Sequence, residues 1–197
     1  MSLSTVRMIL WALVAAVAVG AGLMWINQPE PTESAMDFQS SIGGEYELVA
    51  SDGEPFRSAS LEGRPHAVFF GFTHCPDVCP TTLARLAKLR REVGEDAFDI
   101  LFITVDPERD GPSEVGEYAR LFDTPVIGLT GSEAQIGAVK KQFAVHSEKV
   151  PDGEGGYSVD HSAAVFLMDS EGRFIGTLTS EEGREAALAK LERLASS

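Results

Sequence analysis

The sequence has little positive charge. Lysine and arginine total 16 residues against 30 aspartates and glutamates, which gives a net charge of −14 and a pI near 4.6. Nucleic-acid binding requires a basic patch, and no stripe of lysine and arginine offsets the overall acidity. We therefore exclude nucleic acid as a partner. The acidity favours solubility, or else forms a face that docks a basic partner.

Cysteine is also scarce, and internal repeats and low-complexity tracts are absent. The chain has only two cysteines, Cys75 and Cys79, among 197 residues. This length allows one ordinary domain and an appendage. The apolar content of 44% indicates a packed core rather than disorder.

Charge is missing altogether from Met8 to Ile26. At about 1.5 Å per helical residue this run covers roughly the ~30 Å hydrocarbon core of a bilayer, with Trp11 and Trp25 near its ends. We predict a single membrane anchor, with Arg7 keeping the N-terminus cytoplasmic. A cleaved signal peptide is the alternative, with Ala16-Val17-Ala18 as its cleavage motif. No cysteine follows the run, which argues against a lipid-modified N-terminus.

Composition divides the chain into four parts. Residues 1–7 form a short cytoplasmic segment, 8–26 the anchor, and 27–42 a polar, proline-containing tether. Residues 43–197 form the globular domain. This domain is expected on the periplasmic, or equivalent extracytoplasmic, side of the membrane, where cysteine pairs can form disulfides.

Alternating strand and helix patterns in the domain predict an α/β fold with a mixed sheet and helices on both faces. A strand pair comes first, a run of alternating strands and helices follows, and an antiparallel strand pair with a helix ends the chain. The strands are expected around 46–49, 56, 67–70, 98–105, 126–129, 163–168 and 173–178, with a hairpin over 145–159. The helices are expected from 81 to Gly94, from Pro112, after a Ser132–Gln135 capping box, and after a second box formed by Thr179 and Glu182.

Both cysteines lie between the apolar strand 67–70 and the helix after it. A near-helical turn places Cys75 and Cys79 on the order of 6 Å apart, which allows a disulfide or a shared metal ion. The helix N-terminus is expected to lower the thiol pKa values. Three interpretations remain open: a disulfide that staples the turn, a thiol–disulfide enzyme with one residue more than the usual C-x-x-C spacing, and a metal site.

Among the histidines, His161 is the strongest candidate for a third ligand. It ends the predicted hairpin and leads into the strand 163–168, so its loop can face the cysteine turn. Two thiolates and one imidazole suit a soft, low-coordinate ion, copper(I) above all. Zinc requires a fourth ligand, and the sequence offers none that we can identify.

Three blocks in this order resemble the Sco/SenC family: Gly71–Pro80, Val105–Asp110 and Tyr157–Ser162. The likeness extends from about Gly43 to the C-terminal helix. It implies a thioredoxin-like fold and a copper-binding protein that helps assemble the dinuclear copper centre of cytochrome c oxidase. The resemblance assigns the copper ligands to Cys75, Cys79 and His161. It places Asp160 and Asp106 as supporting residues around them.

The resemblance further implies a metallochaperone rather than an enzyme. It would carry copper as Cu(I), with Cu(II) as a second candidate state. It would take the metal from an upstream periplasmic donor and pass it to the copper-receiving subunit of the oxidase. Three alternatives stay open: a thiol–disulfide reductase acting on the oxidase copper-site cysteines through Cys75 and Cys79, a copper or redox sensor, and a peroxidase of the thioredoxin superfamily.

Overall fold

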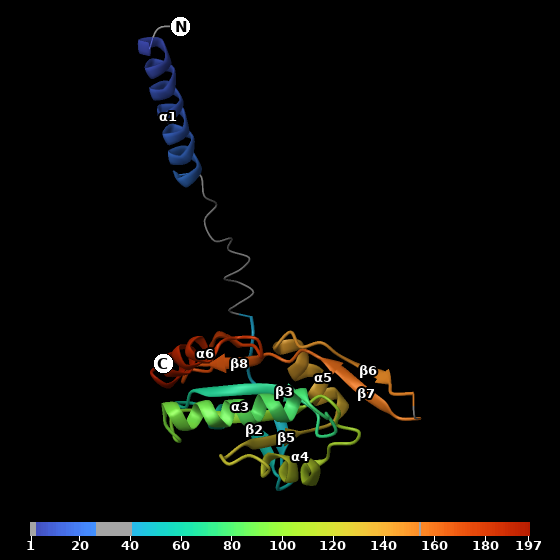
Figure 1. Ribbon diagram of the computed structural model, residues 1–197. Helices are drawn as coiled ribbons and strands as arrows, with labels where there is room; N and C mark the ends of the chain where they lie inside the picture. Colours follow the sequence, from blue (N-terminus) through green and yellow to red (C-terminus); the bar gives the residue numbers. More distant parts are fainter. Residues whose placement is uncertain (1–2, 27–40, 154) are drawn as a thin grey trace. The chain divides into compact units, whose positions relative to one another are not determined.

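The computed structural model describes residues 3–26, 41–153 and 155–197 (Figure 1). The chain divides into two compact units, Met1–Asp37 and Phe38–Ser197. The first unit contains helix α1 (Leu3–Ile26). Among the described residues, no helix satisfies the joint requirement of length and apolarity for crossing a membrane, so the predicted span is not confirmed. Most of the predicted tether, residues 27–40, lies outside the described residues.

The second unit is built on a seven-stranded mixed sheet with the order β2-β1-β5-β4-β3-β8-β9. Strands β3, β4 and β5 are parallel to one another, and the remaining neighbours pair antiparallel. The strands of this sheet are β1 (Glu47–Ala50), β2 (Pro55–Arg57), β3 (His66–Gly71), β4 (Asp99–Thr104), β5 (Ile127–Thr130), β8 (Val165–Met168) and β9 (Phe174–Leu178). The predicted mixed sheet is confirmed.

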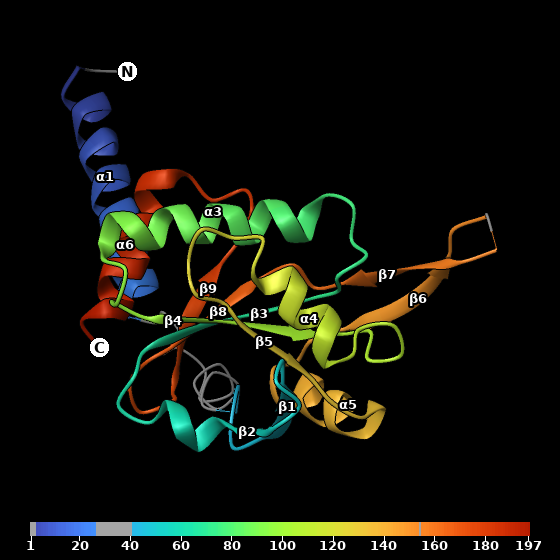
Figure 2. The same ribbon diagram turned by 90° about the horizontal axis from the view of Figure 1, so that it is seen from below.

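Helices cover both faces of this sheet (Figure 2). They are the 3-10 turn η1 (Ser58–Leu61) and the α-helices α3 (Val78–Val93), α4 (Pro112–Ala119), α5 (Glu133–Gln142) and α6 (Arg184–Ala195). Consecutive strand residues point to opposite faces, so the contacts of Phe69 and Phe70 in β3 show which helix covers each face of the sheet. Phe69 contacts Phe102 on the side of α4, whereas the Phe70 ring lies 5.3 Å from that of Phe143, which follows α5.

The hydrophobic core of the Phe38–Ser197 unit is self-contained. The central residues of both parallel strands, 67–70 of β3 and 100–103 of β4, belong to it, as expected for strands covered on both faces. The cluster is formed by residues from Leu48 to Leu194. We therefore expect the unit to fold without the N-terminal segment.

The predicted capping of the last helix by Thr179 and Glu182 is wrong. Helix α6 starts at Arg184 after Gly183, and no side chain caps it. The guanidinium of Arg85 instead donates to the carbonyls of Thr179 and Glu182. This contact from α3 holds the segment as a turn, so the local capping pattern is overridden by a tertiary interaction. The other predicted box, Ser132 with Gln135, is present at the start of α5.

Strands β6 (Ser147–Pro151) and β7 (Tyr157–His161) form a separate two-stranded hairpin. Figure 2 shows this hairpin extending away from the seven-stranded sheet. Its base is joined by bonds between His146 and Ser162. The hairpin therefore carries His161 at the end nearest the body of the domain.

Candidate metal centre

The two cysteines lie on the turn between β3 and α3. Cys79 is in the first turn of α3 and is fully buried, whereas Cys75 is partly exposed, and both are free thiols. Gly71 ends β3 directly beneath them. A Cβ at this position would lie 2.8 Å from the Cys79 sulfur. Gly71 is therefore needed for the close approach of strand and sulfur.

The expected lowering of the thiol pKa is wrong for Cys79. Burial raises the pKa of this thiol well above its ordinary value, because the charged thiolate loses its hydration in the core. This loss outweighs the favourable field of the helix N-terminus. Cys79 is thus a neutral thiol at pH 7, and a metal ion that binds there must displace a proton.

The imidazole of His161 lies against the Cys79 sulfur, although the two residues are 82 positions apart. The Nε2 atom is 3.5 Å from Sγ, and Nδ1 is 3.3 Å from the carbonyl oxygen of Val159. A carbonyl can only accept, so Nδ1 carries the proton and the lone pair of Nε2 faces the sulfur. Burial lowers the pKa of His161, which favours this neutral form.

Aromatic packing fixes the orientation of the same ring. The Phe72 ring meets His161 edge to face at 5.7 Å, and the Phe69 ring does so at 6.4 Å. These contacts come from β3 and the residue after it. The imidazole is therefore held by the sheet as well as by its own strand.

Cys75 lies beside the Cys79–His161 pair and completes a set of three candidate donors. Its sulfur accepts from the backbone N–H of Cys79 at 3.5 Å. In the ranges 3–26, 41–153 and 155–197, no three His, Cys, Asp or Glu side chains already stand in a metal-binding cluster. Two soft sulfurs and a neutral imidazole nevertheless fit a soft ion such as copper(I), provided that the partly exposed Cys75 side chain turns toward the other two.

A cavity of about 470 Å³ opens over two of these donors, Cys75 and His161. We call it the thiol cavity. Its walls come from the cysteine turn, the first residue of α3 and the β6–β7 hairpin. It is lined by Phe72, Cys75, Pro76, Asp77, Val78, Val150, Ser158, Val159, Asp160, His161 and Ala163. A partner or a small chelate can therefore reach the sulfur of Cys75 from solvent.

Asp106 holds the hairpin against the sheet rather than contacting the donors. Its carboxylate is fully buried and accepts from the Arg109 guanidinium and, at 3.0 Å, from the Tyr157 hydroxyl. Arg109 also donates to the Tyr157 carbonyl at 2.9 Å and lies 3.8 Å over its ring. These three residues, the hairpin clamp, join the loop after β4 to the strand that carries His161.

Asp160 is exposed and lies in the wall of the thiol cavity. The partner of His161 Nδ1 is the Val159 carbonyl and not the Asp160 carboxylate. The charge of Asp160 raises the pKa of His161 and so opposes the effect of burial. Its influence on the imidazole is therefore electrostatic.

Asp110 ends the Val105–Asp110 block but was given no role from the sequence, and it is fully buried behind the cysteine turn. Its carboxylate accepts from the Thr73 N–H at 2.9 Å, the Thr73 hydroxyl at 2.6 Å and the Thr104 hydroxyl at 2.7 Å. His74 Nδ1 lies 3.4 Å from the same group. Its place in that block was a signal, but its role was not predictable, because its partners come from β4 and from the residue two places after β3.

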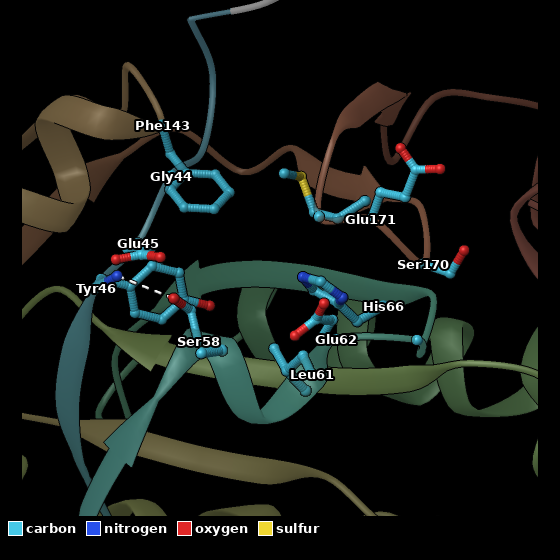
Figure 3. Close-up of a pocket in the computed structure, with 14 residues that line it drawn as sticks. Gly44, Glu45, Tyr46, Ser58, Leu61, Glu62, His66, Phe143, Ser170 and Glu171 are labelled. Carbon is cyan, nitrogen blue, oxygen red and sulfur yellow. Dashed lines mark hydrogen bonds between the residues drawn. The ribbon is translucent and has the colours of Figure 1, made fainter.

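The remaining histidines lie elsewhere. His146 is exposed on the hairpin, 3.9 Å from a Glu148 oxygen. His66 is buried at the start of β3 and lines a larger cavity of about 600 Å³ (Figure 3). That cavity contains neither cysteine. Cavity volume therefore does not identify the candidate metal centre. Cys75 and His161 line the thiol cavity, which is the smaller of these two.

The burial of His66 is expected to make the free energy of unfolding depend on pH. Burial lowers the pKa of its imidazole, so below about pH 6.5 the unfolded chain takes up a proton that the folded chain resists. We expect the free energy of unfolding to fall as the pH drops from 7 to 5, by at most about 1.4 kcal/mol per pH unit for this group. Urea unfolding across this range measures the slope.

His161 contributes to that slope in the same direction, since burial lowers its pKa as well. The share of His66 is the difference in slope between the wild type and His66→Gln. Equal slopes for the two proteins would show that His66 titrates alike in the folded and unfolded states.

Comparisons with known proteins show the family and the fold of this chain. The family model described as SCO1/SenC matches residues 34–196. ScoI from Bradyrhizobium japonicum, solved with copper bound, is 41% identical over 78% of this chain and 99% of that chain, with a TM-score of 0.71. The SCO2-like protein of Rickettsia felis is 35% identical over 83% of this chain and 85% of its own. BsSco, described as a member of the Sco family of cytochrome c oxidase assembly proteins, shares the fold at 22% identity and a TM-score of 0.60.

Proposed function

The chain belongs to the SCO1/SenC family, and we propose that it is a copper chaperone serving cytochrome c oxidase assembly. It would bind copper through Cys75, Cys79 and His161 and deliver it to the copper-receiving subunit of the oxidase. The observation that carries the proposal is the 3.5 Å approach of His161 Nε2 to the Cys79 sulfur. A stapling disulfide gains nothing from an oriented, neutral imidazole at this position, whereas a soft metal ion bound by the two thiolates can take it as a third ligand.

The burial of the donors suggests the order of events for the cargo ion. Cys75 is the donor open to solvent, so it would meet incoming copper(I) first and release it last. Cys79 would lose its proton as its sulfur enters the coordination shell, and His161 would add its lone pair without losing a proton. Transfer would proceed by exchange of one thiolate for another. An upstream periplasmic donor would supply the metal, and Cu(II) is the second state that the site would hold.

A thiol–disulfide reductase is the second candidate. Both cysteines are free thiols, and the Cys75 sulfur already contacts the Cys79 backbone. Exchange with a disulfide of the oxidase would need this pair but not an imidazole. A copper or redox sensor would use the same residues without net transfer of metal. The requirement for His161 therefore separates delivery from simple thiol exchange.

The proposal is tested in cells that lack the wild-type protein. Cys75→Ser and His161→Ala proteins should each fail to restore oxidase activity, while His146→Ala, which alters an exposed histidine on the same hairpin, should restore it. Restoration by His161→Ala together with failure of Cys75→Ser would replace the chaperone by the reductase. Restoration by both substituted proteins would refute both functions.

Attachment to a membrane through residues 8–26 is part of the proposal. In α1 the apolar side chains of Met8, Trp11 and Val17 are each at least 67% exposed, which leaves a large apolar surface for lipid to cover. The N-terminus would be cytoplasmic and the Phe38–Ser197 unit outside. We expect the chain to sediment with membranes after a carbonate wash, and added protease to reach the unit only from the outer side. A fully soluble chain would contradict this.

Weakening the hairpin clamp is expected to lower the copper(I) affinity although Cys75, Cys79 and His161 are unchanged. Arg109→Lys keeps the charge but loses the planar fork that bonds Asp106 and the Tyr157 carbonyl together. We expect about 10-fold weaker copper(I) binding, because supporting contacts of metal ligands have effects of this size. Titration against a competing chelator measures it. Arg120→Lys, at an exposed position, is the matched control, and equal affinities for the two would contradict a positioning role of Arg109.

A further inference from the structure

Exposed large apolar side chains are rare in the described part of the Phe38–Ser197 unit. Only Val78 at 43%, Val150 at 44% and Leu121 at 72% qualify. Val78 and Val150 both line the thiol cavity, on different walls: Val78 begins α3, one residue before Cys79, and Val150 lies on β6. Two of the three exposed large apolar side chains therefore lie at the thiol cavity, whereas the rest of the described surface of the unit has one.

The hairpin places two acidic residues beside Val150. In an antiparallel pair, registered partners lie on one face and alternate residues share it. Glu148 is registered with Asp160, and Val150 with Ser158, so these four residues share one face of the hairpin. All four are exposed. We call this face, together with Val78 and Asp77 across the cavity, the docking face.

Two carboxylates directly opposite each other on one face destabilise a hairpin. Here the register gives Glu148 opposite Asp160, and the side chain of Glu148 is 74% exposed. Among the described residues, the basic partner of Glu148 is His146, at 3.9 Å, and it is charged only when protonated. This like-charge pair favours a partner that brings positive charge to it.

Basic groups near the cavity do not neutralise this acidity. Lys149 points to the other side of β6, where it pairs with Glu108 and lies 4.6 Å over the Tyr157 ring. Arg109 is held by Asp106 within the hairpin clamp. Within residues 41–153 and 155–197, neither Asp77 nor Asp160 forms an ion pair within 4.0 Å. The entrance to the site is thus apolar at two points and acidic around them.

We propose that the docking face binds a copper-exchanging protein whose own metal site has an apolar rim flanked by lysine or arginine. The inference rests on the proposed function and adds the chemistry of the partner. The copper-receiving subunit of the oxidase is the partner to which we assign this surface. Cys79 is fully buried, so a partner can reach the metal only from the side of Cys75 and must bind close to that residue. Val78 and Val150 would exclude water there, while Glu148 and Asp160 would steer the approach.

The test uses the full chain in detergent micelles, loaded with copper(I), and the soluble copper-receiving domain of the oxidase. The rate of metal transfer is followed by the absorption of the receiving centre. Val78→Ser combined with Val150→Ser should slow transfer about 10-fold, within the range over which interface changes alter association. Their copper(I) affinity should equal that of the wild type, which also shows that the doubly substituted protein is folded. Leu121→Ser, at the third exposed apolar position, is the matched control and should transfer at the wild-type rate.

A charge reversal tests the second half of the inference. Glu148→Lys should slow transfer and weaken its dependence on salt, because part of the steering is lost. Glu54→Lys, an exposed reversal on the β1–β2 turn, should leave both unchanged. Wild-type rates for the double serine protein and for Glu148→Lys would overturn the docking face while leaving the chaperone function intact. Absence of transfer from the wild type itself would instead refute the proposed function.

Discussion

Replacement of Cys79 by serine is expected to reduce the copper(I) affinity of the reduced protein by more than about 100-fold, beyond the range typical of supporting residues. The sulfur is fully buried and already lies 3.5 Å from His161 Nε2. Serine keeps the size of the side chain but offers a hard, protonated oxygen to a soft ion. His161→Ala should also weaken binding, since Cys75 and Cys79 would remain without the imidazole.

The measurement is a titration of residues Glu30–Ser197 with copper(I), without oxygen and against a competing chelator. One tightly held copper per chain is expected for the wild type, and also for His146→Ala, which serves as the matched histidine control. Binding that is indifferent to both Cys79 and His161 would exclude the three-donor site. The reduction potential of the cysteine pair would then be the next quantity to measure, because the reductase would become the better explanation.

Replacement of Asp110 by alanine is expected to lower the free energy of unfolding by about 3 kcal/mol or more. The substitution removes the acceptor of three hydrogen bonds and leaves the buried Thr104 hydroxyl without this partner. Asp110→Asn retains one carbonyl oxygen in the same place, so it should lose less. The same network holds Thr73, which begins the cysteine turn, so copper(I) affinity should fall along with stability.

Urea unfolding of residues Glu30–Ser197 measures the stability change through the shift in midpoint at constant slope. Asp123→Ala is the control, because Asp123 is exposed and should change stability by less than about 0.5 kcal/mol. A midpoint for Asp110→Ala equal to that of Asp123→Ala would show that the buried carboxylate contributes nothing net. A lower stability with unchanged copper affinity would separate Asp110 from the metal centre.

Local patterns were sufficient for most of the secondary structure. The apolar run at 67–70, the stop at Gly94, the start at Pro112 and the capping box at Ser132 each depend on residues within a few positions of one another. All four were predicted and are present. The last helix was predicted less well. Arg85 of α3 donates to the Thr179 carbonyl, which would accept the first intrahelical hydrogen bond of a helix capped at Thr179. A contact across 94 residues has no local signal.

The same distinction applies to the site. The sequence by itself determined that two thiols lie at a strand–helix junction, because an apolar run and a helical pattern flank both cysteines. Only Cys79 lies in α3, so the four-residue spacing did not determine how the two sulfurs are placed. Its three blocks further pointed to the family to which the chain belongs. The fold decided the protonation of Cys79, because burial outweighs the helix field and only packing sets burial.

The tertiary structure also decided which histidine meets the thiols and what holds it there. His161 reaches Cys79 because the β6–β7 hairpin returns the chain to the cysteine turn, and the hairpin is held by Arg109 and Tyr157 on Asp106. Asp110 supports the turn from the opposite side. These partners lie 37 to 82 residues apart. Their pairing depends on strand order and register, which emerge only when the whole core assembles.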